Sequence, residues 1–121
     1  MISVRGLAGT FTALFLPLYG THQAHNAALA IAAVESFLGR GTQALVPEIV
    51  AEGLASVTSP GRLQLIATEP TVLVDAAHNP HGAAALAEAL GEYFAFDELA
   101  IVIGVLEDKD AAGIVAALAP V

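Results

Sequence analysis

The chain has 121 residues, of which 56% are hydrophobic and 13% charged, and it contains no cysteine. This composition excludes a disordered chain, a disulfide scaffold and a thiolate zinc site. The formal net charge of −8 argues against nucleic acid and anionic membranes as partners, because binding to either depends on basic side chains. The longest apolar run is far shorter than the roughly 20 residues of a membrane span, and no secretory signal is found, so we expect a cytoplasmic protein.

The first half of the chain predicts strand structure followed by two helices. Residues 1–9 are expected to continue a strand whose partner is missing, and residues 11–19 to form a strand at an edge, since a proline interrupts them. Thr21 is the expected N-cap of a helix over residues 22–38, whose apolar positions cover more than one face. A second helix is expected from Pro47 to about Val57, with apolar residues at helical spacing.

The second half predicts an α/β layer. The turn-rich stretch 56–61 indicates a domain boundary, which divides the chain into residues 1–59 and 60–121. Beyond it we expect, in order, strands at 63–67 and 71–74, a helix over 80–94, a strand at 99–104 and a last helix ending at Leu118. The apolar run 99–104 is typical of a parallel strand covered on both faces. A parallel sheet that stops so early has an unfinished edge, which favours self-association.

Two clusters of polar residues before and at the boundary are candidates for ligand binding. At the start of the first helix, His22 and Asn26 lie four residues apart and share a face, and an amide there can read the edge of a purine. The alternative is a helix cap with solvated polar residues. Arg62, which follows Pro60-Gly61, is placed to reach a phosphate or ribose, or is an ordinary surface arginine.

The turn after the predicted strand 71–74 is the third candidate, because ligands of open α/β sheets bind at the carboxyl ends of strands. Asp75 is suited to ribose hydroxyls or a metal-bound water, and His78 to an anionic substrate at a helix N-terminus. Asn79 is expected to cap the helix that Pro80 begins. A metal site from Asp75, His78 and His81 is a further interpretation, and simple turn and cap chemistry is the alternative to all of these.

The fourth candidate is the turn Gly104 to Asp110, which follows the predicted strand 99–104. Lys109 is placed to contact a phosphate or carboxylate there, while the alternative is an acidic helix start capped by Asp108. No phosphate-binding loop, dinucleotide fingerprint or nucleophile elbow occurs anywhere in the chain. The chain therefore cannot cradle a triphosphate unaided.

Together, the four candidates form an ordered set of motifs. These are Gly20-x-His22-Gln23-x-x-Asn26, then Pro60-Gly61-Arg62, then Asp75-Ala76-Ala77-His78-Asn79-Pro80, then Gly104-x-x-x-Asp108-Lys109-Asp110. The set resembles folylpolyglutamate synthase/dihydrofolate synthase, the folate branch of the Mur ligase superfamily, over nearly the whole chain. Family members usually carry glycine where this chain has Ala76, a departure that leaves the polar residues in place.

The resemblance implies an ATP-dependent ligase that adds L-glutamate to folate or dihydropteroate through an acyl phosphate, with Mg²⁺ as a cofactor whose ligands lie outside this chain. It also implies that Asn26, Arg62 and Asp75 bind ATP. His78 is similar to the histidine near the incoming glutamate, which makes it the candidate catalytic and substrate-binding residue. The turn 108–110 is assigned a supporting role.

The resemblance further implies that residues 1–59 are the end of a P-loop-type ATPase domain and residues 60–121 the start of a Rossmann-like C-terminal domain. The chain by itself is then expected to be incomplete and inactive, because family members are several hundred residues long. Two other classes stay open: a non-catalytic α/β binding or regulatory module, and a small hydrolase or metal-dependent phosphatase built on Asp75 and the histidines. In the ligase, Asn26, Arg62 and Asp75 are expected to converge on one cleft.

Overall fold

The computed structural model describes all residues from 1 to 121 and divides into two compact units, Met1–Thr58 and Ser59–Val121. Each unit combines one two-stranded antiparallel hairpin with two helices, so the α/β class predicted from the sequence is confirmed. None of the helices has the length and apolar character needed to cross a bilayer.

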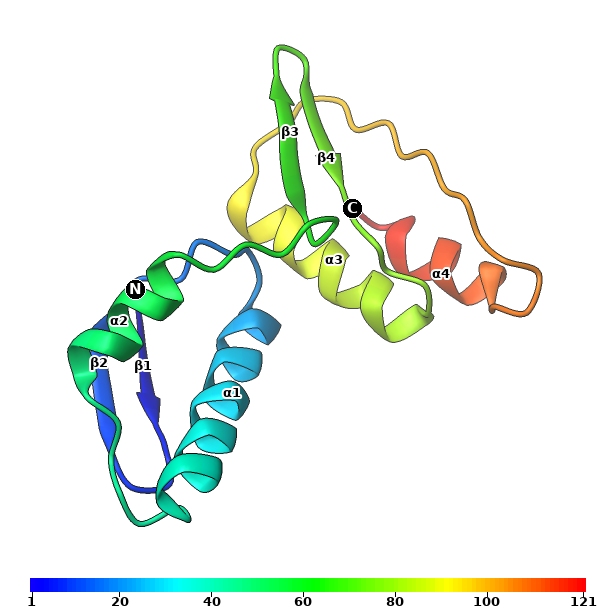
Figure 1. Ribbon diagram of the computed structural model, residues 1–121. Helices are drawn as coiled ribbons and strands as arrows, with labels where there is room; N and C mark the ends of the chain where they lie inside the picture. Colours follow the sequence, from blue (N-terminus) through cyan, green and yellow to red (C-terminus); the bar gives the residue numbers. More distant parts are fainter. The chain divides into compact units, whose positions relative to one another are not determined.

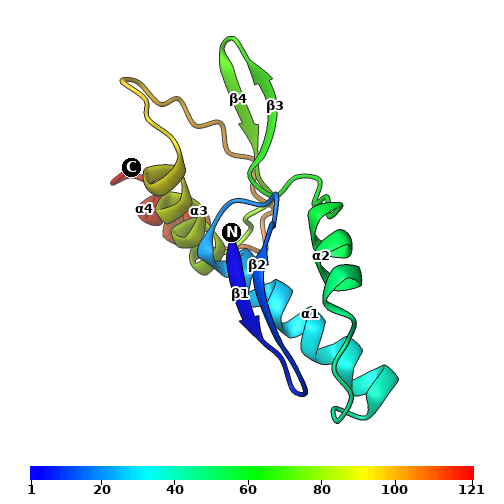
Figure 2. The ribbon, with the colours of Figure 1, turned by 90° about the vertical axis from the view of Figure 1, so that its left-hand side faces the viewer.

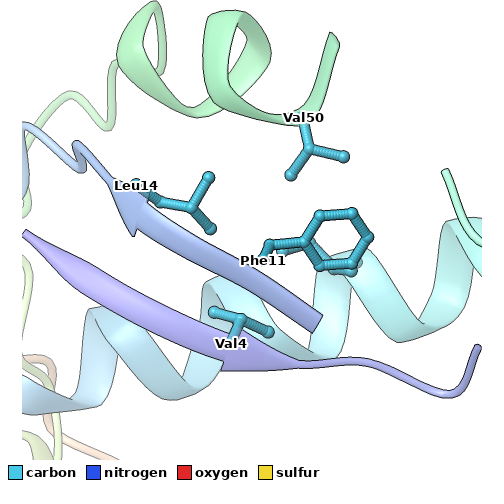
Figure 3. Packing of buried hydrophobic residues seen from close by; sticks show 5 residues of the cluster. Val4, Phe11, Leu14 and Val50 are labelled. Atoms are coloured by element: carbon cyan, nitrogen blue, oxygen red, sulfur yellow. The ribbon is translucent and has the colours of Figure 1, made fainter. Parts of the chain in front are cut away.

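In the first unit, strands β1 (Ile2–Arg5) and β2 (Thr10–Leu14) pair antiparallel and are followed by helices α1 (Thr21–Gly39) and α2 (Pro47–Ala55) (Figure 1). Helix α1 packs against β1 and helix α2 against β2. Side chains from the hairpin and from both helices form one apolar core, part of which is shown in Figure 3: Val4, Phe11, Leu14, Ile31 and Val50. Pro47 begins α2, as its position in the sequence predicted.

Three expectations for the first unit were wrong in detail. The strand in residues 1–9 has its partner within the chain, because β1 pairs with β2. Strand β2 ends at Leu14 rather than reaching residue 19, and Ala13, with a φ of 56°, lies inside it where the register with β1 shifts. Thr21 is the first residue of α1 rather than its cap; Gly20, with φ 97°, is the N-cap and supplies no side-chain bond.

The second unit contains strands β3 (Gln64–Thr68) and β4 (Thr71–Val74) and helices α3 (Pro80–Tyr93) and α4 (Ala111–Leu118). Helix α3 packs along α4, and the base of the β3–β4 hairpin packs on α3, while the tip of the hairpin extends away from the helices in both views (Figures 1 and 2). Two small apolar clusters hold these contacts together: Leu63, Ala89 and Leu90 under the hairpin, and Ala83, Ile114 and Leu118 between the helices.

The predicted parallel layer is not formed. Strands β3 and β4 are joined by a tight turn at Glu69-Pro70 and pair antiparallel with each other only. Residues 99–104 were expected to form a strand and form none; they run from α3 towards α4 without a strand beside them, and Val102 is 99% exposed. A strand needs a neighbour that receives its main-chain hydrogen bonds, and the apolar run alone does not supply one.

Candidate functional site

The turn after β4 is organised by the carboxylate of Asp75. One oxygen, Oδ1, accepts a hydrogen bond from the Ala77 amide at 2.7 Å, and the other, Oδ2, accepts one from the Leu63 amide at 2.8 Å. The first bond folds the chain back on itself directly after the strand. The second joins the turn to the residue before β3, which lies twelve positions earlier in the chain. Leu63 has a φ of 42°, so Asp75 stabilises a backbone conformation that leucine rarely adopts.

Arg62 lies beside this turn because the two residues that flank it are held there. The amide of Leu63 donates to Asp75, and a Cβ added at Gly61 would lie 3.9 Å from the Cβ of Ala76. Gly61 has a φ of 71°, which glycine adopts without strain and which bends the chain just before Arg62. The Arg62 side chain is exposed and makes no ion pair within the chain, so it is available to an anion.

His78 and Asn79 complete the turn and start α3. The Nδ1 atom of His78 lies 3.1 Å from the carbonyl oxygen of Ala76, and because a carbonyl can only accept, Nδ1 is the donor of this bond. The side chain is exposed, and in the tautomer whose only ring proton is on Nδ1 the Nε2 atom is an acceptor. Asn79 caps α3 as predicted, since its Oδ1 accepts from the Gly82 amide at 2.7 Å.

The turn before α4 lies next to the start of α3. Asp110, and not Asp108 as expected, caps α4 by accepting from the Gly113 amide at 2.8 Å. Gly113 is so close to α3 that a Cβ there would lie 2.7 Å from the Cγ of Pro80. Asp108 instead pairs with Lys109 at 2.6 Å, which occupies the lysine that was a candidate for phosphate binding.

Asn26 lies in the first turns of α1, in the other unit, with its side chain exposed. Its Nδ2 atom donates to the Oε1 atom of Gln23 at 3.2 Å. Gln23 itself is buried, with 7% of its surface exposed. Arg62, Asp75 and His78 are thus brought together within the second unit, and Asn26 is presented separately by the first.

Glu35 is a buried polar residue that the sequence interpretation missed. It is 0% exposed, and its Oε2 atom accepts from the amides of Leu7 at 2.5 Å and Ala8 at 3.3 Å in the β1–β2 turn. A Cβ at Gly6 would overlap this carboxylate. The signal was present in the sequence as a spacing of four along α1: Gln23, Ala27, Ile31 and Glu35 are its buried residues.

No three histidine, aspartate or glutamate side chains of the chain lie close enough to hold a metal ion together. The metal site considered for Asp75, His78 and His81 is therefore not formed. Away from this turn, desolvation, a hydrogen bond with Glu92 and the charges of Glu92 and Glu88 raise the pKa of Tyr93.

Comparison with known proteins identifies the protein family to which the chain belongs. The pattern of the Mur ligase glutamate ligase domain matches residues 61–121, so the chain belongs to the Mur ligase family. Within it, the chain is 52% identical to the dihydrofolate synthase/folylpolyglutamate synthase of Mycobacterium tuberculosis, over 100% of the chain and 25% of that protein. It is 39% identical to the protein of the same description from Bacillus subtilis, over 76% of the chain and 21% of that protein.

Solved structures of related proteins support the same assignment. The chain is similar to Mycobacterium tuberculosis folylpolyglutamate synthase complexed with ADP and AMPPCP, with a TM-score of 0.91 and 54% identity, over 96% of this chain and 26% of that one. It is also similar to Escherichia coli FolC in complex with DHPP and ADP, with a TM-score of 0.76 and 36% identity, over 91% and 25%. These relatives are described as folylpolyglutamate synthases or dihydrofolate synthase/folylpolyglutamate synthases, and the chain spans about a quarter of their length.

Proposed function

We propose that the chain is part of an ATP-dependent amide ligase that adds L-glutamate to folate or dihydropteroate. In this reaction the γ-phosphate of ATP passes to a carboxylate, the amine of glutamate attacks the acyl phosphate, and an amide, ADP and inorganic phosphate result. The observation that carries the proposal is the turn held by Asp75, which places an unpaired arginine and an imidazole beside a helix N-terminus. Two solved structures to which the chain is similar are described as complexes with ADP.

The residues of the second unit have distinct roles in this proposal. Arg62 binds nucleotide phosphate, because a guanidinium offers several donors to phosphate oxygens and this one is not engaged elsewhere. Asp75 binds the ribose hydroxyls. His78 lies near the incoming glutamate, where its Nε2 atom can take a proton from the ammonium group of glutamate and leave the free amine that attacks the acyl phosphate, while Nδ1 donates to the Ala76 carbonyl.

In the first unit, Asn26 contacts the adenine ring. We assign residues 1–59 to the end of the ATPase domain and residues 60–121 to the start of the C-terminal domain. The residues present do not fit a Mg²⁺ site, since no carboxylate cluster forms among them. We therefore assign no step to Mg²⁺ within this chain, and expect its ligands in other parts of the enzyme.

A chimera tests the proposal. Residues 1–121 replace the equivalent quarter of the Mycobacterium tuberculosis relative, which is 52% identical over the whole chain. We expect the chimera to release ADP only when ATP, L-glutamate and folate or dihydropteroate are all present. The 121-residue chain alone is expected to give neither ATP hydrolysis nor ligation. Ligation by the isolated chain, or a well-folded chimera without glutamate-dependent turnover, contradicts the proposal.

Variants of the chimera test the phosphate contact. Arg62→Ala is expected to raise the KM for ATP about 10- to 150-fold, which corresponds to the loss of a hydrogen bond to a charged group. Arg5→Ala is the matched control, because Arg5 is exposed on β1 and has no role in the proposed site. Equal effects of the two substitutions would remove the assignment of Arg62.

Two further properties follow from the proposal and the fold. The proposed reaction consumes ATP and glutamate, and we propose that the protein acts in the cytoplasm. Strands β3 and β4 pair with each other only, so each has a free edge, and we expect the isolated chain to associate through it. Analytical ultracentrifugation that finds only a monomer at high concentration contradicts the second expectation.

A further inference from the structure

The rotation of α1 about its own axis is fixed by one buried stripe. Residues at intervals of four along the helix are its buried positions: Gln23, Ala27, Ile31 and Glu35. At one end, the carboxylate of Glu35 accepts main-chain bonds from Leu7 and Ala8. At the other end of the helix the buried position is Gln23, whose side chain is a polar amide and not an apolar group.

That amide is bonded to Asn26. The Oε1 atom of Gln23 accepts from the Nδ2 atom of Asn26 at 3.2 Å. Because Gln23 is buried, its side chain has little freedom to move, whereas Asn26 is exposed. A side-chain amide has two N–H donors and one carbonyl acceptor. One donor of Asn26 is therefore used within the protein, and the second donor and Oδ1 remain for a ligand.

The free donor and the Oδ1 acceptor of Asn26 are complementary to the hydrogen-bonding groups of adenine. Adenine presents an acceptor at N7 and a donor at N6, whereas guanine presents acceptors at both N7 and O6. An asparagine amide whose Nδ2 donates to N7 and whose Oδ1 accepts from N6 pairs with adenine, and the same orientation sets Oδ1 against the O6 atom of guanine. A rotated amide would lose this discrimination.

We propose that Gln23 is a positioning residue that determines base specificity, by holding the Asn26 amide in the orientation that accepts adenine and rejects guanine. The proposal rests on the proposed function, in which Asn26 contacts the base of the nucleotide. It assigns Gln23 no contact with the nucleotide.

The bond itself is tested in the 121-residue chain without any ligand. Nitrogen-15 spectra resolve the Asn26 side-chain amide, and its exchange with solvent is compared with that in Gln23→Met, which keeps the volume of the side chain and removes the acceptor. We expect exchange to be about fivefold faster in Gln23→Met, which corresponds to the loss of one ordinary hydrogen bond. Unchanged exchange overturns the proposal.

The effect on specificity is tested in the chimera by the ratio of kcat/KM for ATP to kcat/KM for GTP. We expect Gln23→Met to lower this ratio about 3- to 10-fold through a higher KM for ATP, with kcat unchanged. Gln23→Glu keeps an acceptor and no donor, so it is expected to preserve the ratio even where its charge weakens the binding of both nucleotides. A structural role alone would change both nucleotides equally and leave the ratio constant in Gln23→Met, which overturns the proposal.

Asn26→Ala separates this inference from the function on which it rests. If Asn26→Ala leaves the KM for ATP unchanged, the assigned base contact is wrong. If Asn26→Ala raises that KM and Gln23→Met leaves the ratio constant, the base contact stands and the role of Gln23 alone is refuted. A lower ratio in Gln23→Glu also refutes it, because the acceptor is still present.

Discussion

Replacing Glu35 by alanine removes the acceptor that joins α1 to the β1–β2 turn. The Leu7 amide donates to its carboxylate at 2.5 Å and the Ala8 amide at 3.3 Å, and nothing else in the chain replaces this acceptor. A hydrogen bond to a charged group contributes about 1.5–3 kcal/mol, and the longer bond about 1 kcal/mol or less. Releasing a buried carboxylate offsets part of this loss. We expect Glu35→Ala to destabilise the first unit by about 1–3 kcal/mol.

This is a large share of what holds the unit together. Folded domains have about 0.05–0.15 kcal/mol of stability per residue, which gives about 3–9 kcal/mol for Met1–Thr58. Hydrogen exchange measured by mass spectrometry reports on peptides from each unit separately. We expect the amides of β1, β2 and α1 to exchange about 5- to 150-fold faster in Glu35→Ala, while the slowest amides of α3 are unchanged.

Two control variants test whether loss of the Glu35 acceptor is the cause of the destabilisation. Glu52→Ala removes an exposed carboxylate from α2 and is expected to change stability by less than about 0.5 kcal/mol. Glu35→Gln can place its carbonyl oxygen where Oε2 lies and its amino group at Oε1, a buried atom without a partner. Glu35→Gln is therefore expected to lower the stability of the first unit by about 1 kcal/mol or less. If Glu35→Ala behaves like Glu52→Ala, or Glu35→Gln costs as much as Glu35→Ala, the acceptor is not what stabilises the unit.

Two further predictions concern the second unit. Gly113→Ala is expected to cost about 1–3 kcal/mol in thermal unfolding, because its Cβ would overlap the Asp110 carboxylate and lie 2.7 Å from the Cγ of Pro80, whereas Gly91→Ala, with open space around it inside α3, is expected to stabilise by about 0.5–1 kcal/mol. Similar melting temperatures for the two would contradict the close approach of α4 to α3. In a Tyr19→Phe chain, absorbance at 295 nm reports on Tyr93 alone, and its titration midpoint is expected above the usual value of about 10. The folded state then keeps this proton longer than the unfolded chain, so the contribution to stability is complete below pH 10 and is lost as the pH rises further; a midpoint at or below 10 refutes this.

The features that the sequence predicted well are those decided by local chemistry. Asn79 and Pro80 occupy the cap and first position of α3, and Pro47 begins α2, because a missing amide or a side-chain acceptor acts within one turn of helix. Asp110 caps α4, whereas the sequence interpretation offered Asp108, two residues earlier, as the alternative cap. Both aspartates offer the same acceptor, and the sequence does not show which one the packing of Gly113 on Pro80 brings into place.

The features that the sequence did not predict depend on partners distant in the chain. The burial of Glu35 needs contacts with Leu7 and Ala8, which lie 28 and 27 positions away in the chain, whereas the pairing of β1 with β2 is a local hairpin that the strand patterns did not reveal. For residues 99–104, the sequence instead predicted a strand that is not formed. Five consecutive apolar residues indicate a tendency to be buried, but a strand also needs main-chain partners, and here there are none.

The role of Asp75 is a case in which a structural and a ligand-binding interpretation are compatible. Its two oxygens accept from Leu63 and Ala77, yet a carboxylate has about four acceptor positions, so two remain for the hydroxyls of a ribose. The main-chain bonds also fix the orientation of the carboxylate before any ligand arrives, which reduces the entropy lost on binding. The same bonds hold the backbone on either side of Arg62. A turn that is rigid without its ligand is therefore what the proposed nucleotide site requires, and the structural bonds of Asp75 support its binding role instead of competing with it.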